Sequence, residues 1–193
     1  MGESIKGLKR TAYCAEFDMK NVGDEITVFG WVQRQRNLGT LIFIDLRDRT
    51  GIIQLSFNEN TDKELFEKAK ATRTEWVVAA KGIVAERESK NKEIPTGDIE
   101  VMVNEYRIIS VAQTPPFEVE KTFEVGEDTT LKYRYLALRN EKLTQNILMR
   151  HKIAKIAREY FYENDFIEIE TPMMIKSTPE GARDYVVPSR IHG

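Results

Sequence analysis

Short runs in which hydrophobic and polar residues alternate fill residues 25–57 and predict three consecutive β-strands. The runs cover residues 25–36, 41–46 and 52–57, and each is rich in β-branched or aromatic residues. Segments containing turn residues separate them at positions 37–39 and 48–51. Gly30, in the middle of the first run, predicts a bulge or bend that lets the sheet curl. We therefore expect a curved meander with one buried face.

The middle run presents two different faces. Side chains alternate across a strand, so Leu41, Phe43 and Asp45 share one side and the hydrophobic residues between them share the other. Four arginines belong to the same meander: Arg34, Arg36, Arg47 and Arg49. An aromatic ring beside basic side chains suits a single-stranded nucleic acid, whose bases stack and whose phosphates attract cations. A core aromatic beside a solvated polar edge fits the same residues, so both interpretations stay open.

One helix and two further strands are predicted after the meander. Residues 60–72 start with polar residues, with Asn60 or Thr61 as the capping residue, and continue with an apolar stripe. Residues 75–85 and 99–111 return to a β-rich composition. Five strands with a helix between the third and fourth is the element order of the OB-fold, whose second and third strands bind oligonucleotides. An SH3-like barrel also fits this order.

The pattern changes after residue 111. Residues 112–130 carry two adjacent prolines, several acidic residues and little periodic hydrophobicity, which is typical of a hinge or linker. Asn140 is the predicted cap of a long helix whose apolar face we expect to be buried: Met149, Ile153, Ile156, Ala157, Tyr160 and Phe161. We expect Asn164 to end this helix in a left-handed conformation and residues 166–170 to form a strand. The predicted domains are residues 1–111 and 131–193.

Composition and charge narrow the possible classes of protein. The chain is 41% hydrophobic and 31% charged, and its formal net charge is −2, so any contact with RNA must be local. Cys14 is the only cysteine, which excludes an intramolecular disulfide and a zinc cluster built on several cysteines. Without a signal core or an apolar span, the sequence predicts a cytoplasmic protein that makes no membrane contact. We expect the polar residues before Tyr13 to be mobile and to have no role.

Longer motifs resemble a known family. The residues LKYRYL at 131–136, the long helix, and FIEIETPMM at 166–174 resemble the entry to a class II aminoacyl-tRNA synthetase catalytic domain, with Pro172 as the essential proline of its first motif. The residues STPEGARDYVVPS at 177–189 and GWVQRQRNLGTLIFIDLRDRTGIIQ at 30–54 are similar to the bacterial-type aspartyl-tRNA synthetase family. The resemblance implies an all-β five-stranded OB-fold barrel followed by the incomplete start of an α+β class II catalytic domain.

The resemblance also implies a function. The full-length protein would activate aspartate with ATP and Mg²⁺, transfer it to tRNA-Asp and work as a homodimer, while the barrel holds the anticodon. Phe43 would stack on the central anticodon base, and the amide of Gln54 would read that base through its donor and acceptor. Glu100 would accept hydrogen bonds from the guanine-like first anticodon base, whose Watson-Crick edge carries adjacent N–H donors.

Four other residues match RNA-binding positions of the family. Arg34 and Arg36 match basic positions where a planar guanidinium reaches a phosphate or stacks on a base. Asn91 matches a position in the loop between the fourth and fifth strands. Leu38 and Asn91 resemble the forms that accept only the aspartate tRNA.

The catalytic part contributes one expected substrate contact. Glu180 corresponds to the carboxylate that receives the ammonium group of bound aspartate through a charge-assisted bond. Glu168 and Glu170 would share one face of a strand, which could suggest a metal site, but the family builds its dimer interface in this region, so we expect no metal there. The remaining aspartate contacts and the ATP-binding residues of the family are not in this sequence. We therefore expect this chain to bind RNA, not to bind ATP or Mg²⁺ tightly, and not to aminoacylate.

Two alternatives remain open. A freestanding OB-fold RNA-binding module would need no catalytic half. A lysyl- or asparaginyl-tRNA synthetase relative would share the architecture but prefer other anticodons. Whether the reading frame continues beyond Gly193 separates the first alternative from a ligase, and comparing anticodons separates the second.

Overall fold

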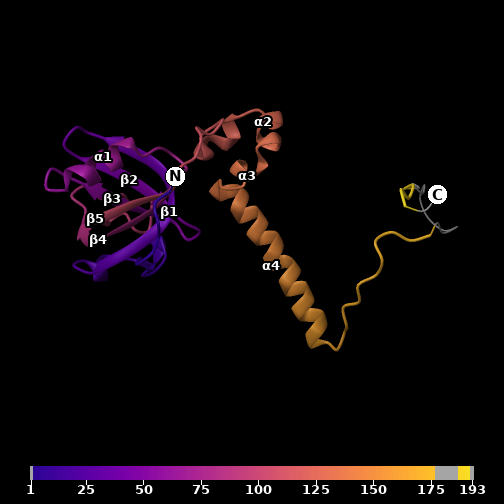
Figure 1. The fold of residues 1–193 in the computed structure, drawn as a ribbon. Coiled ribbons are helices and arrows are strands. Elements are labelled where there is room, and N and C mark those ends of the chain that lie inside the picture. Colours follow the sequence, from indigo (N-terminus) through magenta and orange to yellow (C-terminus); the bar gives the residue numbers. More distant parts are fainter. Residues whose placement is uncertain (1, 177–186, 192–193) are drawn as a thin grey trace. The chain divides into compact units, whose positions relative to one another are not determined.

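A closed five-stranded barrel forms the first of two compact units in the computed structural model (Figure 1). The structure describes residues 2–176 and 187–191, and the units are residues 1–118 and 119–193. The elements of the first unit are two 3₁₀ turns (Cys14–Glu16 and Met19–Asn21), β1 (Glu25–Asn37), β2 (Ile42–Arg47), β3 (Ile52–Phe57), α1 (Lys63–Ala71), β4 (Val77–Glu86) and β5 (Ile99–Ser110). The five predicted strands and the helix between β3 and β4 are confirmed. The strand order β1-β2-β3-β5-β4, with β3 and β5 parallel, is that of the OB-fold.

The barrel interior is filled by one face of each strand. On β2, Ile42, Ile44 and Leu46 are fully buried while the residues between them are partly exposed, as the alternation predicts. Burying each of these side chains contributes about 1.5 to 3 kcal/mol. The rings of Phe57 and Tyr106 meet edge to face at 5.3 Å and close the core between β3 and β5. The core therefore fixes which side of β2 faces outward.

Gly30 lies where β1 passes from its pairing with β4 to its pairing with β2. A Cβ atom at this position would lie 2.4 Å from the carbonyl oxygen of Arg47, which is too close for any side chain. The register shift in β1 falls between Val32 and Arg34, just after the glycine. Gly30 is thus required by a close approach of two backbones, and the predicted irregularity lies slightly further along the strand.

The cap of α1 differs from the prediction. Asp62 is the capping residue, because its Oδ1 accepts from the backbone N–H of Glu64 at 2.9 Å and from the following amide. Thr61 instead accepts from the backbone of Asn58 at 3.0 Å, and Asn60 belongs to the same turn. The prediction of Asn60 or Thr61 was wrong because this polar turn precedes the helix.

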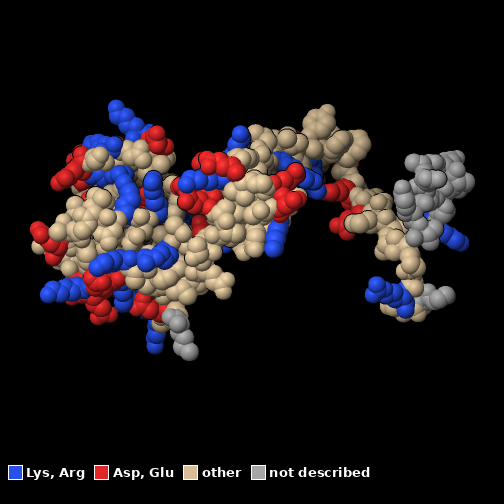
Figure 2. All heavy atoms as spheres, turned by 90° about the horizontal axis from the view of Figure 1, so that it is seen from above, with Lys and Arg blue, Asp and Glu red and all other residues tan. Residues whose placement is uncertain are grey.

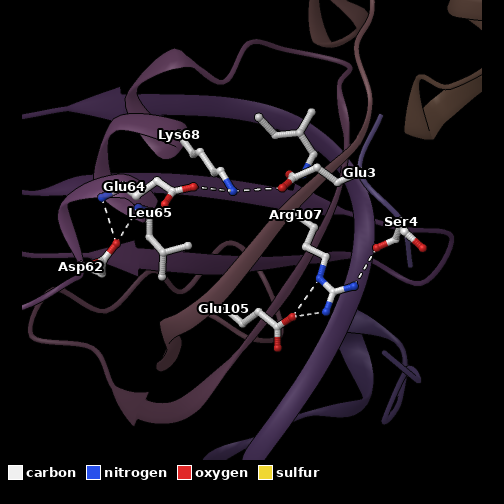
Figure 3. Close-up of polar contacts among 9 residues, drawn as sticks. Glu3, Ser4, Asp62, Glu64, Leu65, Lys68, Glu105 and Arg107 are labelled. Carbon is white, nitrogen blue, oxygen red and sulfur yellow. Dashed lines mark hydrogen bonds and ion pairs between the residues drawn. The ribbon is translucent and has the colours of Figure 1, made fainter. Parts of the chain in front are cut away.

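The N-terminal segment is attached to β5, which corrects the expectation that it has no role (Figure 3). The backbone N–H of Glu3 donates to Ile108 O at 2.8 Å, and its carboxylate accepts from Ile108 N at 2.6 Å and pairs with Lys68 at 2.9 Å. Arg107 donates to the carbonyl oxygen of Ser4 at 2.7 Å. Because β5 pairs with β3 only near its start, this segment covers backbone groups that another chain could otherwise pair with.

Glu3→Gln is expected to lower the free energy of unfolding by about 1 kcal/mol at pH 7, since it removes a partly exposed ion pair and a charged hydrogen bond. Partial burial opposes ionisation, but the Ile108 N–H and Lys68 hold the pKa of the Glu3 carboxyl below its usual value of 4.5. A pKa lowered in the folded state contributes stability above the unfolded-state pKa, and this stability is lost as the pH falls through the folded-state value.

The measurement for Glu3 is urea unfolding of both proteins at several pH values. The difference in unfolding free energy between wild type and Glu3→Gln should be largest near neutral pH. It should shrink as the pH falls below the usual carboxyl pKa of 4.5. Glu59→Gln, at an exposed position, is the control and should show little difference at any pH. A Glu3→Gln effect that stays constant through the acid range would contradict this role of the carboxylate.

The second unit begins with helical segments, and its described residues after Glu163 form neither a helix nor a strand. The helical segments are a 3₁₀ segment (Val119–Glu124), α2 (Glu127–Lys132), α3 (Arg134–Ala137) and α4 (Glu141–Glu163). The region expected to be a linker therefore contains helical segments from Val119 onward, and the boundaries at residues 111 and 131 stay predictions. Asn140 caps α4 by accepting from Lys142 N at 3.1 Å, as expected, and its amide donates to Val119 O at 3.0 Å. This bond ties the start of α4 to the 3₁₀ segment.

The apolar face of α4 is exposed, so the expectation that it is buried was wrong. The exposed fractions are 59% for Met149, 62% for Ile153, 64% for Ile156, 62% for Tyr160 and 52% for Phe161. An amphipathic helix buries its stripe only when another element packs against it. Within the described part of the second unit, no element covers this face.

The end of α4 also differs from the prediction. Asn164 has a φ of −104°, and it is Asp165, with a φ of 65°, that takes the left-handed conformation. Residues 166–170 form no strand, because a strand needs a neighbouring strand to satisfy its backbone groups. The ring of Phe166 instead packs on Phe161 at 5.4 Å.

Candidate nucleic-acid interface

The outer face of the barrel brings together residues from four strands. Cross-strand neighbours share a face, and the register pairs Arg36 with Phe43 and Asp45 with Gln54. The parallel pairing of β3 and β5 then places Glu100 beside Gln54. These five side chains are consecutive neighbours across β1, β2, β3 and β5, on the side opposite the core.

A chain of hydrogen bonds links the polar members of this group. Nη2 of Arg36 donates to Gln54 Oε1 at 2.8 Å and to Asp45 Oδ1 at 3.2 Å. Nε2 of Gln54 donates to Glu100 Oε2 at 2.6 Å. The guanidinium of Arg36 lies 5.6 Å from the centre of the Phe43 ring, close enough for a cation-π contact. We call these five residues the Gln54 cluster.

The Gln54 cluster has the chemistry needed to hold an unstacked base. Phe43 is half-buried on the outer face and provides a ring on which a base can stack. Gln54 is only 4% exposed, and each half of its amide uses one bond inside the cluster. One N–H and one lone pair of the amide therefore stay available for the edge of a base. Glu100 adds a carboxylate that accepts from N–H donors.

The other predicted RNA-binding residues lie around this cluster or in loops. Arg34 is exposed on β1 and pairs in register with Asp45. Leu38 lies in the β1–β2 loop and is 68% exposed. Asn91 lies in the β4–β5 loop, where its Oδ1 accepts from Glu93 N at 2.9 Å and shapes the turn. The structure thus groups Arg34 with the Gln54 cluster and leaves Leu38 and Asn91 on loops.

Two arginines of the meander are engaged elsewhere. Nη2 of Arg47 donates to both carboxylate oxygens of Glu75, at 2.8 and 3.1 Å, and both side chains are largely buried. Arg49 lies 4.2 Å from the centre of the Tyr13 ring. Sequence reasoning missed Glu75, because no local pattern links it to a residue 28 positions away. Of the four arginines in the meander, only Arg34 and Arg36 therefore remain in the candidate interface.

Charge on the barrel surface is mixed. On the face of the first unit that Figure 2 shows, basic and acidic side chains lie next to one another without a large area of one sign. This distribution agrees with the net charge of −2. A barrel with this charge distribution could select an RNA only through local contacts such as those of the Gln54 cluster.

The structure gives little information on the residues that we expected in the catalytic part. Glu180 lies outside the described residues, and Pro172 is exposed in an irregular segment. Within residues 2–176 and 187–191, no group of three or more histidine, cysteine, aspartate or glutamate side chains could hold a metal ion. No helix in those ranges has the length and apolar character needed to cross a membrane.

Family models match both parts of the chain. The model described as OB-fold nucleic acid binding domain matches residues 26–109. The model described as tRNA synthetases class II (D, K and N) matches residues 126–193. Together they place a nucleic-acid-binding barrel before the beginning of a synthetase domain.

Similar proteins point to one member of that class. The chain is 55% identical to the aspartate-tRNA ligase of Ruminiclostridium cellulolyticum and 52% identical to the aspartate-tRNA(Asp/Asn) ligase of Caldanaerobacter subterraneus subsp. tengcongensis. Each match covers 100% of this chain but only 32% and 33% of the relative, so the chain spans about a third of their length.

A solved structure supports the fold. Asparaginyl-tRNA synthetase from Pyrococcus horikoshii, complexed with asparaginyl-adenylate, matches with a TM-score of 0.78 at 28% identity, over 91% of this chain and 39% of that one. The match to aspartate enzymes extends past the barrel, so a freestanding OB-fold module is not favoured. The identity to these enzymes is also higher than the 28% identity to the asparaginyl enzyme, so an asparaginyl or lysyl relative is not favoured either. The chain belongs to the class II aspartyl-tRNA synthetase family.

Proposed function

We propose that the barrel binds the anticodon of tRNA-Asp and that the whole protein is an aspartate-tRNA ligase. The identity of 55% to an aspartate-tRNA ligase over the full chain supports this assignment. The whole enzyme activates aspartate with ATP and Mg²⁺, transfers it to the tRNA and acts as a cytoplasmic homodimer. Glu180 binds the ammonium group of aspartate, and the segment around Pro172 contributes to the dimer interface. We assign no described residue to ATP or Mg²⁺.

The observation that carries the proposal is the Gln54 cluster on the outer face of the barrel. Phe43 stacks on the central anticodon base, and Gln54 reads its edge with the donor and acceptor that the cluster leaves available. Glu100, beside Gln54 in the register, accepts from the guanine-like first base. Arg34 and Arg36 contribute positive charge next to these bases.

The two loop residues set the preference among related tRNAs. Leu38 presents an exposed side chain from the β1–β2 loop, and Asn91 lies in the β4–β5 loop. Loops at the ends of OB-fold strands flank the ligand, so both are placed to contact neighbouring anticodon bases. The relatives include ligases named for tRNA-Asp alone and for both tRNA-Asp and tRNA-Asn. We propose that this chain accepts only the aspartate tRNA.

Equilibrium binding of the 193-residue chain to anticodon stem-loop RNAs tests the proposal. Four RNAs with the same stem carry the aspartate, asparagine or lysine anticodon or a scrambled loop. The aspartate stem-loop is expected to bind about tenfold more tightly than each of the others, the discrimination that one bidentate base contact provides. Equal binding of all four would disprove anticodon recognition by the barrel. Tightest binding of the asparagine or lysine stem-loop would instead assign the chain to that specificity.

A further inference from the structure

The orientation of the Gln54 amide is determined by its neighbours. Oxygen and nitrogen of a glutamine amide are nearly equal in size, so only hydrogen bonding decides which way the group points. Arg36 offers only donors, and its Nη2 faces Oε1 at 2.8 Å. Glu100 offers an acceptor, and its Oε2 faces Nε2 at 2.6 Å. A half turn of the amide would set donor against donor and acceptor against acceptor.

Asp45 holds the arginine that imposes this orientation. The Arg36 side chain is long and 41% exposed, so it needs an anchor to stay beside Gln54. Its Nε is buried without a hydrogen-bond partner in the described structure, and its Nη2 donates to Asp45 Oδ1 at 3.2 Å. Asp45 faces Gln54 directly in the β2–β3 register. The carboxylate therefore supplies the charged anchor of Arg36.

The orientation of the amide determines which base it fits. In the observed orientation, the remaining Oε1 lone pair accepts from a base N–H and the remaining Nε2 hydrogen donates to a base carbonyl. Uracil presents this pair through N3–H and O4. Cytosine presents the opposite pair, an acceptor at N3 and a donor at N4, and fits the amide only after a half turn.

We propose that Asp45 is a positioning residue that makes the barrel select uridine over cytidine at the central anticodon position, by holding Arg36 and so the Gln54 amide. This inference rests on the proposed anticodon binding. Aspartate codons have a central adenine and glycine codons a central guanine, so the selection separates the aspartate anticodon from the glycine anticodon GCC. Asp45 acts through Arg36 and does not itself contact the base.

The test compares two anticodon stem-loops that differ only by uridine or cytidine at the central position. Wild-type protein is expected to prefer the uridine RNA by about tenfold or more. Asp45→Asn should reduce this preference at least about fivefold, because the neutral side chain holds Arg36 weakly and the amide can turn. Asp45→Glu keeps the charge and should retain most of the preference. Asp45→Ser also removes the carboxylate, with a smaller side chain, and it is used if Asp45→Asn does not fold.

Glu25→Gln is the matched control. It removes one negative charge from another ion pair of the barrel, with Lys81 at 2.8 Å, and should leave the preference unchanged. A folded Asp45→Asn or Asp45→Ser protein with the wild-type preference would overturn this inference alone. A wild-type protein that binds the uridine and cytidine RNAs equally would also overturn this inference, and only one that binds neither more tightly than the scrambled loop would overturn the proposed anticodon binding as well. Equal loss of preference in Asp45→Asn and Glu25→Gln would assign the effect to charge alone and would also reject the positioning role.

Discussion

Phe43→Ala is expected to weaken binding of the aspartate anticodon stem-loop by about 1 to 3 kcal/mol, the usual contribution of one base stacked on an aromatic side chain. The ring is half-buried on the outer face of β2, while the core face of that strand is formed by other residues. The loss should therefore affect binding more than folding. Because every base has a face that stacks, the uridine and cytidine stem-loops should lose affinity by the same factor.

This uniform loss separates Phe43 from the residues that read the base edge. Gln54→Ala should weaken the uridine stem-loop more than the cytidine one, because it removes the amide that distinguishes them. The measurement is equilibrium titration, with thermal unfolding to confirm the fold of each variant. Phe29→Ala is the control. It also removes a half-buried ring, but this ring belongs to β1 and lies near Arg10. Unchanged affinity of Phe43→Ala would show that the recognition face is elsewhere.

Arg47→Met is expected to lower the free energy of unfolding by about 3 to 5 kcal/mol, the usual effect of breaking a buried ion pair. The side chains of Arg47 and Glu75 are 15% and 6% exposed, so the substitution leaves a buried carboxylate without its guanidinium. Glu75 also has a φ of 64°, in the left-handed region that non-glycine residues adopt at a cost of roughly 1 to 2 kcal/mol. The ion pair and the bond from Glu75 N to Val32 O at 2.7 Å hold this conformation.

Chemical unfolding of four variants tests this role: Arg47→Met, Glu75→Gln, the two combined, and Arg49→Met. Arg49→Met replaces an exposed arginine whose guanidinium lies over the Tyr13 ring, and it should change the unfolding free energy by less than about 1 kcal/mol. Arg47→Met combined with Glu75→Gln should lose less than the sum of the single losses, because the buried charge is also removed. The uridine preference of Arg47→Met should match wild type. A loss below about 1 kcal/mol in Arg47→Met would contradict the structural role of the pair.

Several features of the site could be predicted because they depend on local spacing. The outward direction of Phe43 follows from the alternation of β2 once the hydrophobic positions between its polar ones are assigned to the core. The sequence motif then relates Phe43, Gln54 and Glu100 to the family. Their proximity depends on the β3–β5 pairing, which joins residues 46 positions apart and has no local signal.

Other features escaped prediction because they join distant positions. Glu3 and Ile108 lie 105 residues apart, and polar residues near a terminus carry no pattern that indicates where they attach. The amphipathic pattern of α4 predicts a helix correctly, but whether its apolar face is buried depends on another element. Residues 166–170 have strand composition, yet strand formation requires a partner for hydrogen bonding.

The sequence by itself determined the order of the elements, the inward and outward faces of the strands and the family resemblance, since each depends on the spacing of residue types along the chain. The tertiary structure alone decided which partner each charged side chain takes. Arg36 binds Asp45 and Gln54, whereas Arg47 binds Glu75, although both arginines looked equivalent in the meander. The physical reason is that pairing of charges and amides depends on distances of about 3 Å between strands, which only the closed barrel establishes.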